Sequence, residues 1–389
     1  MRRRENTSLS ERLARLTPEQ RALLRRRLAE RGRTDDPTQA AASPAASSVP
    51  VSEARIPRRE QGVRLPLSHA QERLWFLNRL EKDSAFYNIP MGLRMFGPLN
   101  VDALERAFQE IVRRHEVLRT TFSAEAGVPH QVVHSDLTAR FECVDRTDVA
   151  ANERGARLAQ AAQDEVRVPF DMERGPLVRA VVIRFAADDH GFLLSIHHTV
   201  ADGWSRGVVI SELEQLYAAF VKNEPSPLPP LEVQYGDFAV WQRRWLSGER
   251  FEFEMRYWEK QLATISALQL PTDRPRIADT VHEGAKFLRI LPHDLLDRVK
   301  TFARGARVTP FMALLAAFKV LLQRLSTEDD VVVGVPTANR NWAATEPMVG
   351  FFVNSLVMRT DLGGDPTFRT LLERVRQTAV GAFEHRNVP

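Results

Sequence analysis

The sequence predicts a mixed α and β fold of two large units that follow a short helical head. Its 389 residues correspond to two or three folding units at about 150 residues per domain. After Ser68, apolar residues repeat with helical spacing in some segments and form short continuous runs, typical of buried strands, in others. Hydrophobic residues are 43% of the chain and charged residues 27%, which is ordinary for a globular protein with a large core.

The head covers residues 1–33 and is strongly basic. It holds eleven arginines, no lysine and four glutamates, whereas the whole chain has a formal net charge of only +4. The segment Thr17-Pro18-Glu19-Gln20 predicts a helix start, because an N-cap residue precedes proline at the first helical position. Two short leucine stripes indicate two helices that are too small for a core of their own, so we expect the head to dock on something else.

A linker is predicted over residues 34–62. This segment is rich in alanine, serine and proline and carries few large apolar residues, which is typical of disordered chain. The body then begins at residue 63. No internal repeat is visible, and length alone suggests a division into units of residues 63–235 and 236–389.

The body shows its elements in the following order. Helical periodicity predicts helices over Ala70 to Leu80, Val101 to Arg113, Trp204 to Val221, Phe238 to Trp258 and Thr309 to Leu325. Apolar runs predict strands over His130 to Val133, Leu177 to Arg184, Gly191 to His197, Val331 to Pro336 and Phe351 to Thr360.

The composition excludes several classes of protein. A single cysteine, Cys143, leaves no intramolecular disulfide framework and no multi-cysteine metal site. No apolar run of about 18 residues predicts a membrane span, and the N-terminus lacks the apolar core of a signal peptide, so a cytoplasmic protein is the default. Residues 34–389 carry a net charge of −3, which argues against a nucleic-acid-binding body.

The segment from His197 to Ser205 is the clearest candidate site. Because successive strand side chains point to opposite faces, His197 and His198 are not expected to serve one centre, which argues against a metal there. Asp202 can cap the following helix or pair with an arginine, and Gly203 presents an N–H at a helix N-terminus, where negative charge is stabilised. The sequence shows no nucleophile elbow, phosphate-binding loop or zinc spacing, so a lone histidine that transfers a proton is the predicted chemistry.

Five ordered motifs resemble those of the condensation domains of nonribosomal peptide synthetases, which belong to a group of acyltransferases with an HHxxxDG signature. The similar segments are Ser68 to Leu77, Arg114 to Phe122, His197 to Ser205, Tyr235 to Trp241 and Val349 to Arg359. The last residues, 385–389, are similar to the start of a sixth motif, after which family members continue. We therefore expect a C-terminally truncated piece of a longer synthetase.

The resemblance implies an α+β fold of two chloramphenicol-acetyltransferase-like lobes set in a V, the second lobe incomplete. It also implies an amide-bond-forming acyltransferase, in which a carrier-bound aminoacyl amine attacks a carrier-bound acyl or peptidyl thioester. No cofactor or metal is bound directly, because the phosphopantetheine arms belong to the upstream donor and downstream acceptor carrier domains. Residues 1–33 become a candidate docking element for an upstream synthetase subunit, and no nucleic acid or membrane is implied as a partner.

The resemblance assigns roles within the motifs. His198 accepts the amine proton or positions the amine, two roles that stay open, and the Gly203 N–H is the candidate oxyanion donor. His197 and Asp202 are expected to be structural. The arginine that pairs with Asp202 is left open between Arg119 and Arg359. Residues expected to line the tunnel or hold the motifs together are Ser68, Gln71, Arg73, Trp204, Ser205, Tyr235, Asp237, Asn354 and Ser355.

Three alternatives compete with this interpretation. An epimerisation domain also carries the double histidine, but the segments at Tyr235 and Val349 resemble condensation motifs more closely. A free-standing acyltransferase that uses coenzyme A thioesters fits poorly with the head and linker. A non-catalytic module that recruits carriers or other partners is the third. Within the condensation family, the Tyr87 to Pro90 segment resembles domains that join an L-configured donor to an L-configured acceptor.

Overall fold

The computed structural model describes residues 55–60, 62–81, 84–273 and 287–389, so the predicted head and most of the predicted linker lie outside the described residues. The chain forms two compact units. The first extends to Arg244 and also includes Arg340–Phe352, and the second comprises Trp245–Asn339 and Val353–Pro389. The boundary expected between residues 235 and 236 therefore falls inside the first unit, to which a later segment returns.

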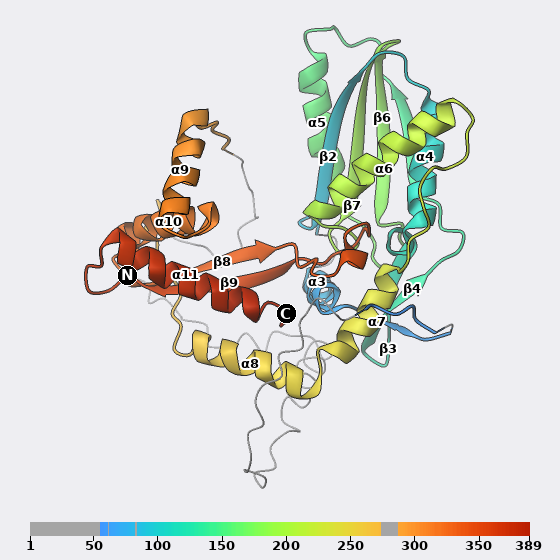
Figure 1. Cartoon of the computed structure of the whole chain (residues 1–389). Helices are drawn as coiled ribbons and strands as arrows, with labels where there is room; N and C mark the ends of the chain where they lie inside the picture. The colour runs from blue at the N-terminus through green and yellow to red at the C-terminus, as the bar shows by residue number, and fades with distance from the viewer. Residues whose placement is uncertain (1–54, 61, 82–83, 274–286) are drawn as a thin grey trace, which may run out of the picture. The chain divides into compact units, whose positions relative to one another are not determined.

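A four-stranded sheet in the order β2-β7-β6-β5 forms the centre of the first unit (Figure 1). Its strands are β2 (Asn88–Phe96), β5 (Arg140–Asp145), β6 (Val178–Ala186) and β7 (Asp189–His197). β7 is buried along its whole length, because antiparallel neighbours flank it on both sides and helices cover both faces of the sheet, so that even its polar residues, such as Ser195, are buried. A smaller sheet joins β1 (Leu65–Pro66), β4 (Val128–Val133) and β3 (Thr120–Glu125).

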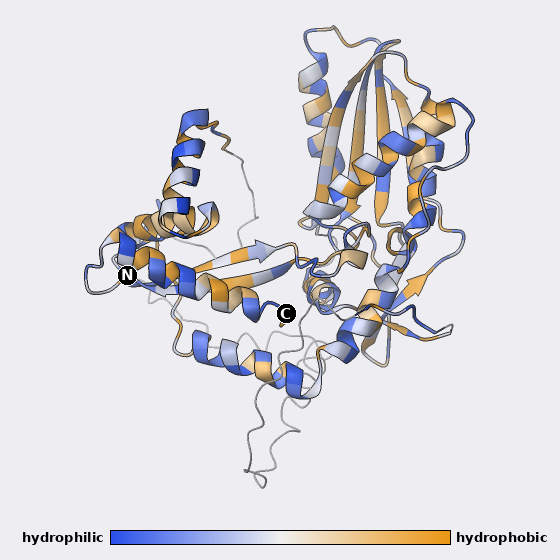
Figure 2. Cartoon of the chain, in the orientation of Figure 1, coloured by the Kyte–Doolittle hydropathy of each residue, from blue (hydrophilic) through white to orange (hydrophobic). Residues whose placement is uncertain are grey.

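Helices cover both faces of the four-stranded sheet. On one face α5 (Arg154–Arg167) packs so closely on β7 that a Cβ added to Gly191 would lie 2.5 Å from the Leu158 side chain. On the other face, Leu194 and Ile196 line a small cavity with the first turns of α6 (Gly203–Val221), which packs against α4 (Val101–Arg114). Figure 2 shows hydrophobic residues concentrated in the strands between these helices.

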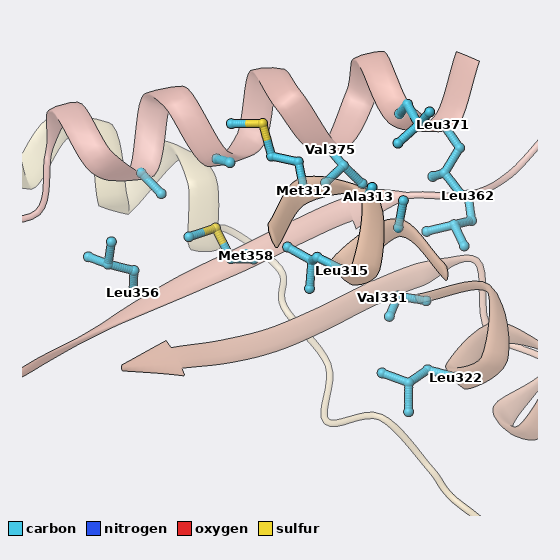
Figure 3. Close-up of a cluster of buried hydrophobic side chains, with 14 of the residues drawn as sticks. Met312, Ala313, Leu315, Leu322, Val331, Leu356, Met358, Leu362, Leu371 and Val375 are labelled. Atoms are coloured by element: carbon cyan, nitrogen blue, oxygen red, sulfur yellow. The ribbon is translucent and has the colours of Figure 1, made fainter. Parts of the chain in front are cut away.

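The second unit packs helices on a two-stranded sheet. Its elements are α8 (Gly248–Leu262), α9 (His293–Gly305), α10 (Pro310–Ser326), β8 (Asp330–Thr337), β9 (Asn354–Asp361) and α11 (Phe368–Glu384). Leu315 of α10, Met358 of β9 and Val375 of α11 belong to one buried hydrophobic cluster (Figure 3). This cluster explains the apolar periodicity of α10, whose start is marked by the cap Thr309 and by a proline at the first helical position.

Within the described ranges, no single helix is long and apolar enough to be a candidate membrane span. α9 and α10 pass a length and composition test only as a pair, and the pair is bent by 100° at the break between them.

The mixed α+β class predicted from the sequence is confirmed, but two predicted elements are wrong in extent. The helix expected over 238–258 is two helices, α7 (Tyr235–Trp245) and α8, because the chain turns at Gly248, which has a φ of 57°. The strand expected from Phe351 begins only at Asn354, as β9, because the Phe352 N–H donates instead to a carboxylate of the first unit.

The last residues of the predicted linker also differ from the expectation of disorder. Ile56 is only 3% exposed, and the neighbouring Arg58 and Arg59 form hydrogen bonds to residues 231–237 of the first unit. The apolar side chain and the two cations anchor this short segment, although the alanine-rich and serine-rich stretch before it lies outside the described residues. The linker prediction is therefore wrong for residues 55–60.

Candidate active site

His198 directly follows β7, at the end of the central strand. Its ring Nδ1 lies 2.9 Å from the carbonyl oxygen of Ala201, and its backbone N–H donates to the Tyr87 carbonyl at 2.8 Å. Because a carbonyl oxygen only accepts hydrogen bonds, Nδ1 carries the proton of the neutral ring, and Nε2 keeps its lone pair. The ring of Phe351 stands edge-on to the imidazole at 4.8 Å between centroids. The backbone thus defines which nitrogen of this half-buried ring can act as a base.

His197 has different surroundings, and its side chain is buried. Its Nδ1 accepts the backbone N–H of Thr199 at 3.2 Å, so the proton of the neutral ring is on Nε2. Burial, and to a lesser extent the neighbouring His198, lowers the pKa of His197 to about 4. The ring is neutral near pH 7 and contributes packing. Among the described residues no group of three or more histidine, cysteine, aspartate and glutamate side chains is arranged to hold a metal.

Asp202 is paired with Arg340, a partner that the sequence analysis did not include. Nη2 of Arg340 lies 3.1 Å from Oδ1 of Asp202, and the two side chains are 2% and 0% exposed. Nη1 of the same guanidinium donates to the carbonyl oxygens of Thr345 and Met348, the latter at 2.7 Å. Burial lowers the pKa of Arg340, while the Asp202 carboxylate opposes that shift. This pair is a buried ionic contact with backbone acceptors around it.

Both arginines proposed as partners of Asp202 are occupied elsewhere, so these two pairings are wrong. Arg119 ends the short helix η2 (Glu116–Arg119) and lies 3.8 Å from the Glu116 carboxylate. Arg359 lies in the second unit, where its Nη2 is 2.8 Å from Asp330. Each guanidinium pairs with a carboxylate of its own surroundings, and the arginine that meets Asp202 comes from the segment that returns to the first unit at residue 340.

Asp202 also organises the backbone around it. Its Oδ1 caps α6 by accepting the Ser205 N–H at 2.8 Å, and its Oδ2 accepts the Phe352 N–H at 3.2 Å. The Ser205 hydroxyl accepts the N–H of Gly350 at 3.1 Å. The returning segment 340–352 is therefore held to the start of α6 by one carboxylate and one hydroxyl, and it carries Phe351 to the His198 ring.

Gly203 is the first residue of α6, where backbone N–H groups lack partners within the helix. It is exposed, and a Cβ added there would meet nothing within 4 Å, so the described neighbours do not require glycine at this position. The next residue, Trp204, is 48% exposed, and its indole N–H donates to the Glu346 carbonyl at 3.0 Å. The start of α6 is thus exposed at Gly203 and Trp204, next to the buried Asp202 cap.

Tyr235 and the residues of α3 (His69–Leu80) support the two segments that flank His198. The Tyr235 hydroxyl donates to the Phe351 carbonyl at 2.5 Å and lies 2.8 Å from the Ser68 hydroxyl, which caps α3. Gln71 completes a capping box with Ser68, and its side-chain amide donates to the Thr199 carbonyl at 3.3 Å. Burial raises the pKa of Tyr235, which keeps its hydroxyl protonated as this donor.

Asp237 and Arg73 have contrasting environments. Asp237 is 4% exposed and forms an ion pair with Arg59 at 2.9 Å. Arg73 is half-buried on α3, and no hydrogen bond or ion pair joins it to another described residue. Asp237 is thus held by an ion pair within the first unit, whereas the Arg73 guanidinium has no such partner among the described residues.

Asn354 and Ser355 begin β9 in the second unit. Asn354 donates through its side-chain amide to the carbonyl oxygens of Arg386 and Val388, at 2.8 and 2.5 Å. Ser355 is exposed, and its N–H donates to the Asn354 side chain at 2.9 Å. These contacts connect β9 to the last described residues of the chain, inside the second unit.

Sequence reasoning missed Arg340 and the contact between Phe351 and His198. Arg340 follows a buried strand within a polar stretch, which is typical of an exposed loop and gave no reason to expect burial. Its carboxylate partner lies 138 residues earlier, and no local spacing relates residues so far apart. The sequence offered one signal, the expectation that Asp202 pairs with an arginine. It did not indicate which of the many arginines is the partner.

Comparison with known proteins gives consistent results. A family model described as a condensation domain matches residues 61–389. One of the linear gramicidin synthase proteins of Brevibacillus parabrevis is 46% identical over 326 residues, which cover 84% of this chain and 6% of the relative. Phosphinothricin tripeptide synthetase PhsC of Streptomyces viridochromogenes is 39% identical over 383 residues, which cover 98% of this chain and 34% of the relative. The chain thus spans a minor part of the length of these curated relatives.

A solved structure shares the fold. The X-domain from teicoplanin biosynthesis, solved in complex with OxyB, has a TM-score of 0.77 and 29% sequence identity to this chain. The match covers 86% of this chain and 74% of that chain.

Proposed function

This chain belongs to the condensation-domain family, and from that premise we propose that it forms peptide bonds in nonribosomal peptide synthesis. In this reaction a carrier-bound aminoacyl amine attacks a carrier-bound acyl or peptidyl thioester. The observation that carries the proposal is the orientation of His198, whose Nδ1 proton is engaged by the Ala201 carbonyl. Its unprotonated Nε2 is then available to the attacking amine.

The reaction needs a proton acceptor and a stabiliser of negative charge. An α-amino group has a pKa of about 8, so a useful fraction of the acceptor is already neutral near pH 7. Its nitrogen bonds to the thioester carbon, and the adduct carries a positive nitrogen and a negative oxygen. His198 removes the nitrogen's proton or holds the amine in line, and base catalysis of this kind contributes about 10²- to 10⁴-fold. The C–S bond then breaks, and the leaving thiolate takes up a proton.

The negative oxygen of the adduct is assigned to the N-terminus of α6. The Gly203 N–H belongs to the first turn of this helix, where positive partial charge stabilises a developing oxyanion. Asp202 and Arg340 take no part in bond making in this scheme. They hold the loop between β7 and α6 against the returning segment, so that the imidazole and the helix terminus keep their positions.

The partners follow from the same scheme. Upstream donor and downstream acceptor carrier domains bring both substrates on phosphopantetheine arms, so the chain needs no cofactor of its own. We propose the subtype that joins an L-configured donor to an L-configured acceptor. We also propose that the protein works in the cytoplasm. Residues 1–33 are proposed to dock an upstream synthetase subunit, and deleting them should weaken binding of that subunit.

A single-turnover assay tests the activity. Donor and acceptor carriers are loaded with simple aminoacyl groups, and the acceptor arm is weighed by intact mass spectrometry. We expect a dipeptidyl acceptor with the unmodified chain, a loss of at least about 10²-fold with His198→Ala, and little change with His130→Ala, a half-buried histidine of the smaller sheet. Product formation at equal rates in all three would contradict the assignment of His198.

A recruiting module of the same fold is the second candidate. The observation that favours it is the likeness to an X-domain solved in complex with another protein, OxyB. A recruiter would form no dipeptide and would bind its carrier with the same affinity before and after His198→Ala. An epimerisation-type relative would instead exchange the α-proton of a bound aminoacyl group with deuterated solvent, without any dipeptide.

A further inference from the structure

A short segment at the start of the described chain bears on the active site. Residues 55–60, which we call the N-terminal strap, precede the part of the chain matched by the family model. The Ile56 side chain anchors the strap, being 3% exposed. We propose that Arg59 is a positioning residue for the active site, through which the strap fixes the helix start that supports Phe351 and His198. The proposal rests on the proposed peptide-bond formation.

Arg59 makes the contacts that carry the proposal. Its Nη2 lies 2.7 Å from Glu116 of η2, and its Nη1 lies 2.9 Å from Asp237 of α7. Its backbone N–H also donates to Asp237 at 3.2 Å. Burial acts to lower the pKa of Arg59, but the two carboxylates outweigh it and the pKa is raised. One guanidinium therefore joins two elements that are far apart in sequence.

The side chain also lies against the backbone of α7. A Cβ added to Gly236 would stand 3.2 Å from Nη1 of Arg59, which is closer than an ordinary contact. Glycine at this position therefore leaves room for the arginine to reach Asp237. The strap and the first turn of α7 are fitted to each other.

The contacts continue from Asp237 to the start of α7. The second oxygen of Asp237 accepts the Gln234 N–H at 2.8 Å. The Gln234 side chain in turn accepts the Glu116 N–H at 3.1 Å and donates to the Arg114 carbonyl at 2.9 Å. Arg59, Asp237, Gln234 and Glu116 thus form a closed ring of polar contacts around the first turn of α7.

The first turn of α7 leads directly to the active site. Tyr235, its first residue, is buried, and its hydroxyl donates to the Phe351 carbonyl. The Phe351 ring packs on the His198 imidazole. A shift of the turn would move Tyr235, then Phe351, then the imidazole, so Arg59 would act on the base only through these residues.

Removal of the guanidinium should produce such a shift. Asp237 would be left as a buried carboxylate without its cationic partner, and Glu116 would lose the charge that draws η2 toward α7. A displacement of about 1 Å at a reacting group can cost on the order of 10²-fold in rate. Arg59 lies outside the motifs of the family, yet the structure connects it to the orientation of the base.

The strap contains its own control. Arg58, the preceding residue, binds the same surface, but it donates only to the exposed carbonyl oxygens of Glu232 and Leu231, at 2.7 and 3.3 Å. Substituting Arg58 removes one arginine from the strap and leaves the ring around α7 intact. Arg58→Ala therefore separates a general loosening of the strap from the specific loss of the Asp237 contact.

The test uses the full chain with Arg59→Ala, Arg59→Lys and Arg58→Ala. Single-turnover rates are measured against acceptor-carrier concentration, and backbone hydrogen exchange is followed over 114–118, 233–238 and 349–352. We expect Arg59→Ala to lower the maximal rate by about 10- to 100-fold with little change in half-saturation, and to speed exchange in all three segments. Arg59→Lys should restore part of the rate, and Arg58→Ala should resemble the unmodified chain.

Several outcomes would overturn the proposal. It fails if Arg59→Ala keeps the full rate, if Arg58→Ala loses as much, or if exchange over 233–238 and 349–352 stays as slow as in the unmodified chain. If Arg59→Ala does not fold, Glu116→Gln is used, because it removes one of the two ionic contacts and keeps a hydrogen-bond acceptor. If the unmodified chain forms no dipeptide, the proposed function fails, while exchange over 233–238 and 349–352 still decides whether Arg59 holds these segments.

Discussion

Arg340 in the first unit and Lys319 in the second are both buried basic side chains, but they have different partners. Arg340 faces the Asp202 carboxylate at 3.1 Å and donates to two backbone carbonyls. Nζ of Lys319 donates only to the carbonyl oxygens of Val331 and Met358, at 2.8 and 2.6 Å. Burial lowers the pKa of both, and that of Lys319 falls to about 8.

The difference teaches what each charge does for its unit. The Arg340 charge holds segment 340–352 to the start of α6. The same guanidinium pairs with the Asp202 carboxylate and donates to carbonyl oxygens within that segment. The Lys319 ammonium group lies next to a hydrophobic cluster and donates hydrogen bonds to one carbonyl oxygen of each neighbouring strand, β8 and β9. Loss of the first charge should open the active site, whereas loss of the second should change only the pH dependence of stability.

The largest effect is expected from Arg340→Ala. The substitution leaves Asp202 as a buried, unpaired carboxylate, which costs about 3–5 kcal/mol of unfolding free energy. Urea unfolding, followed by tryptophan fluorescence, measures the loss. The double substitution Arg340→Met with Asp202→Asn removes both charges and should recover part of it. A loss below about 1 kcal/mol for Arg340→Ala would show that the pair does not hold the segment.

Lys319 gives the second effect, and its sign follows from the two pKa values. The folded value is about 8 and the ordinary value is 10.5, so the unfolded chain binds more protons between these pH values. Stability should therefore rise as the pH increases from about 8 to 10.5, by on the order of 3 kcal/mol at most. Lys319→Met should abolish this rise, and the difference between the two chains isolates the lysine from other titrating groups. An equal rise in the free energy of unfolding in both chains would show that Lys319 does not cause this pH dependence.

The third effect concerns packing of the returning segment on the first unit. A Cβ added to Gly350 would overlap the Tyr235 ring, with Cε2 at 2.5 Å. Gly350→Ala should cost about 1–3 kcal/mol, because the ring or the segment must move. Gly207→Ala is the matched control, since nothing lies within 4 Å of its Cβ position on α6, and it should be neutral or stabilising by up to about 1 kcal/mol. Equal stability of the two variants would mean that the segment is loosely held.

The smallest effect is expected from Arg359→Ala. Arg359 and Asp330 form an ion pair like that of Arg340 and Asp202, but their side chains are 23% and 35% exposed. An exposed pair contributes about 0–1 kcal/mol and weakens with salt. Unfolding in low and high salt measures it beside Arg340→Ala. A loss as large as that of Arg340→Ala would remove the contrast between the buried and the exposed pair.

Local patterns predicted most elements because their causes are local. The helix at 101–113 follows from its apolar periodicity, and α4 covers Val101–Arg114. The break between α7 and α8 was missed because nothing in the spacing of aromatic residues marks the positive φ at Gly248. The sequence predicted that Asp202 caps a helix or pairs with an arginine, but it did not predict which arginine. Asp202 and Arg340 are 138 residues apart, and no periodic spacing in the sequence relates residues at that distance.

The sequence by itself determined the family, the mixed α and β class and the segment that carries His198, because motif order and short-range spacing are written along the chain. Only the tertiary structure decided which nitrogen of His198 is free, which arginine meets Asp202, and that residues 55–60 and 340–352 join the first unit. These features depend on single hydrogen bonds and buried charges between distant segments. The free energy of each such hydrogen bond or ion pair depends on how deeply its groups are buried, and burial arises only when the chain folds.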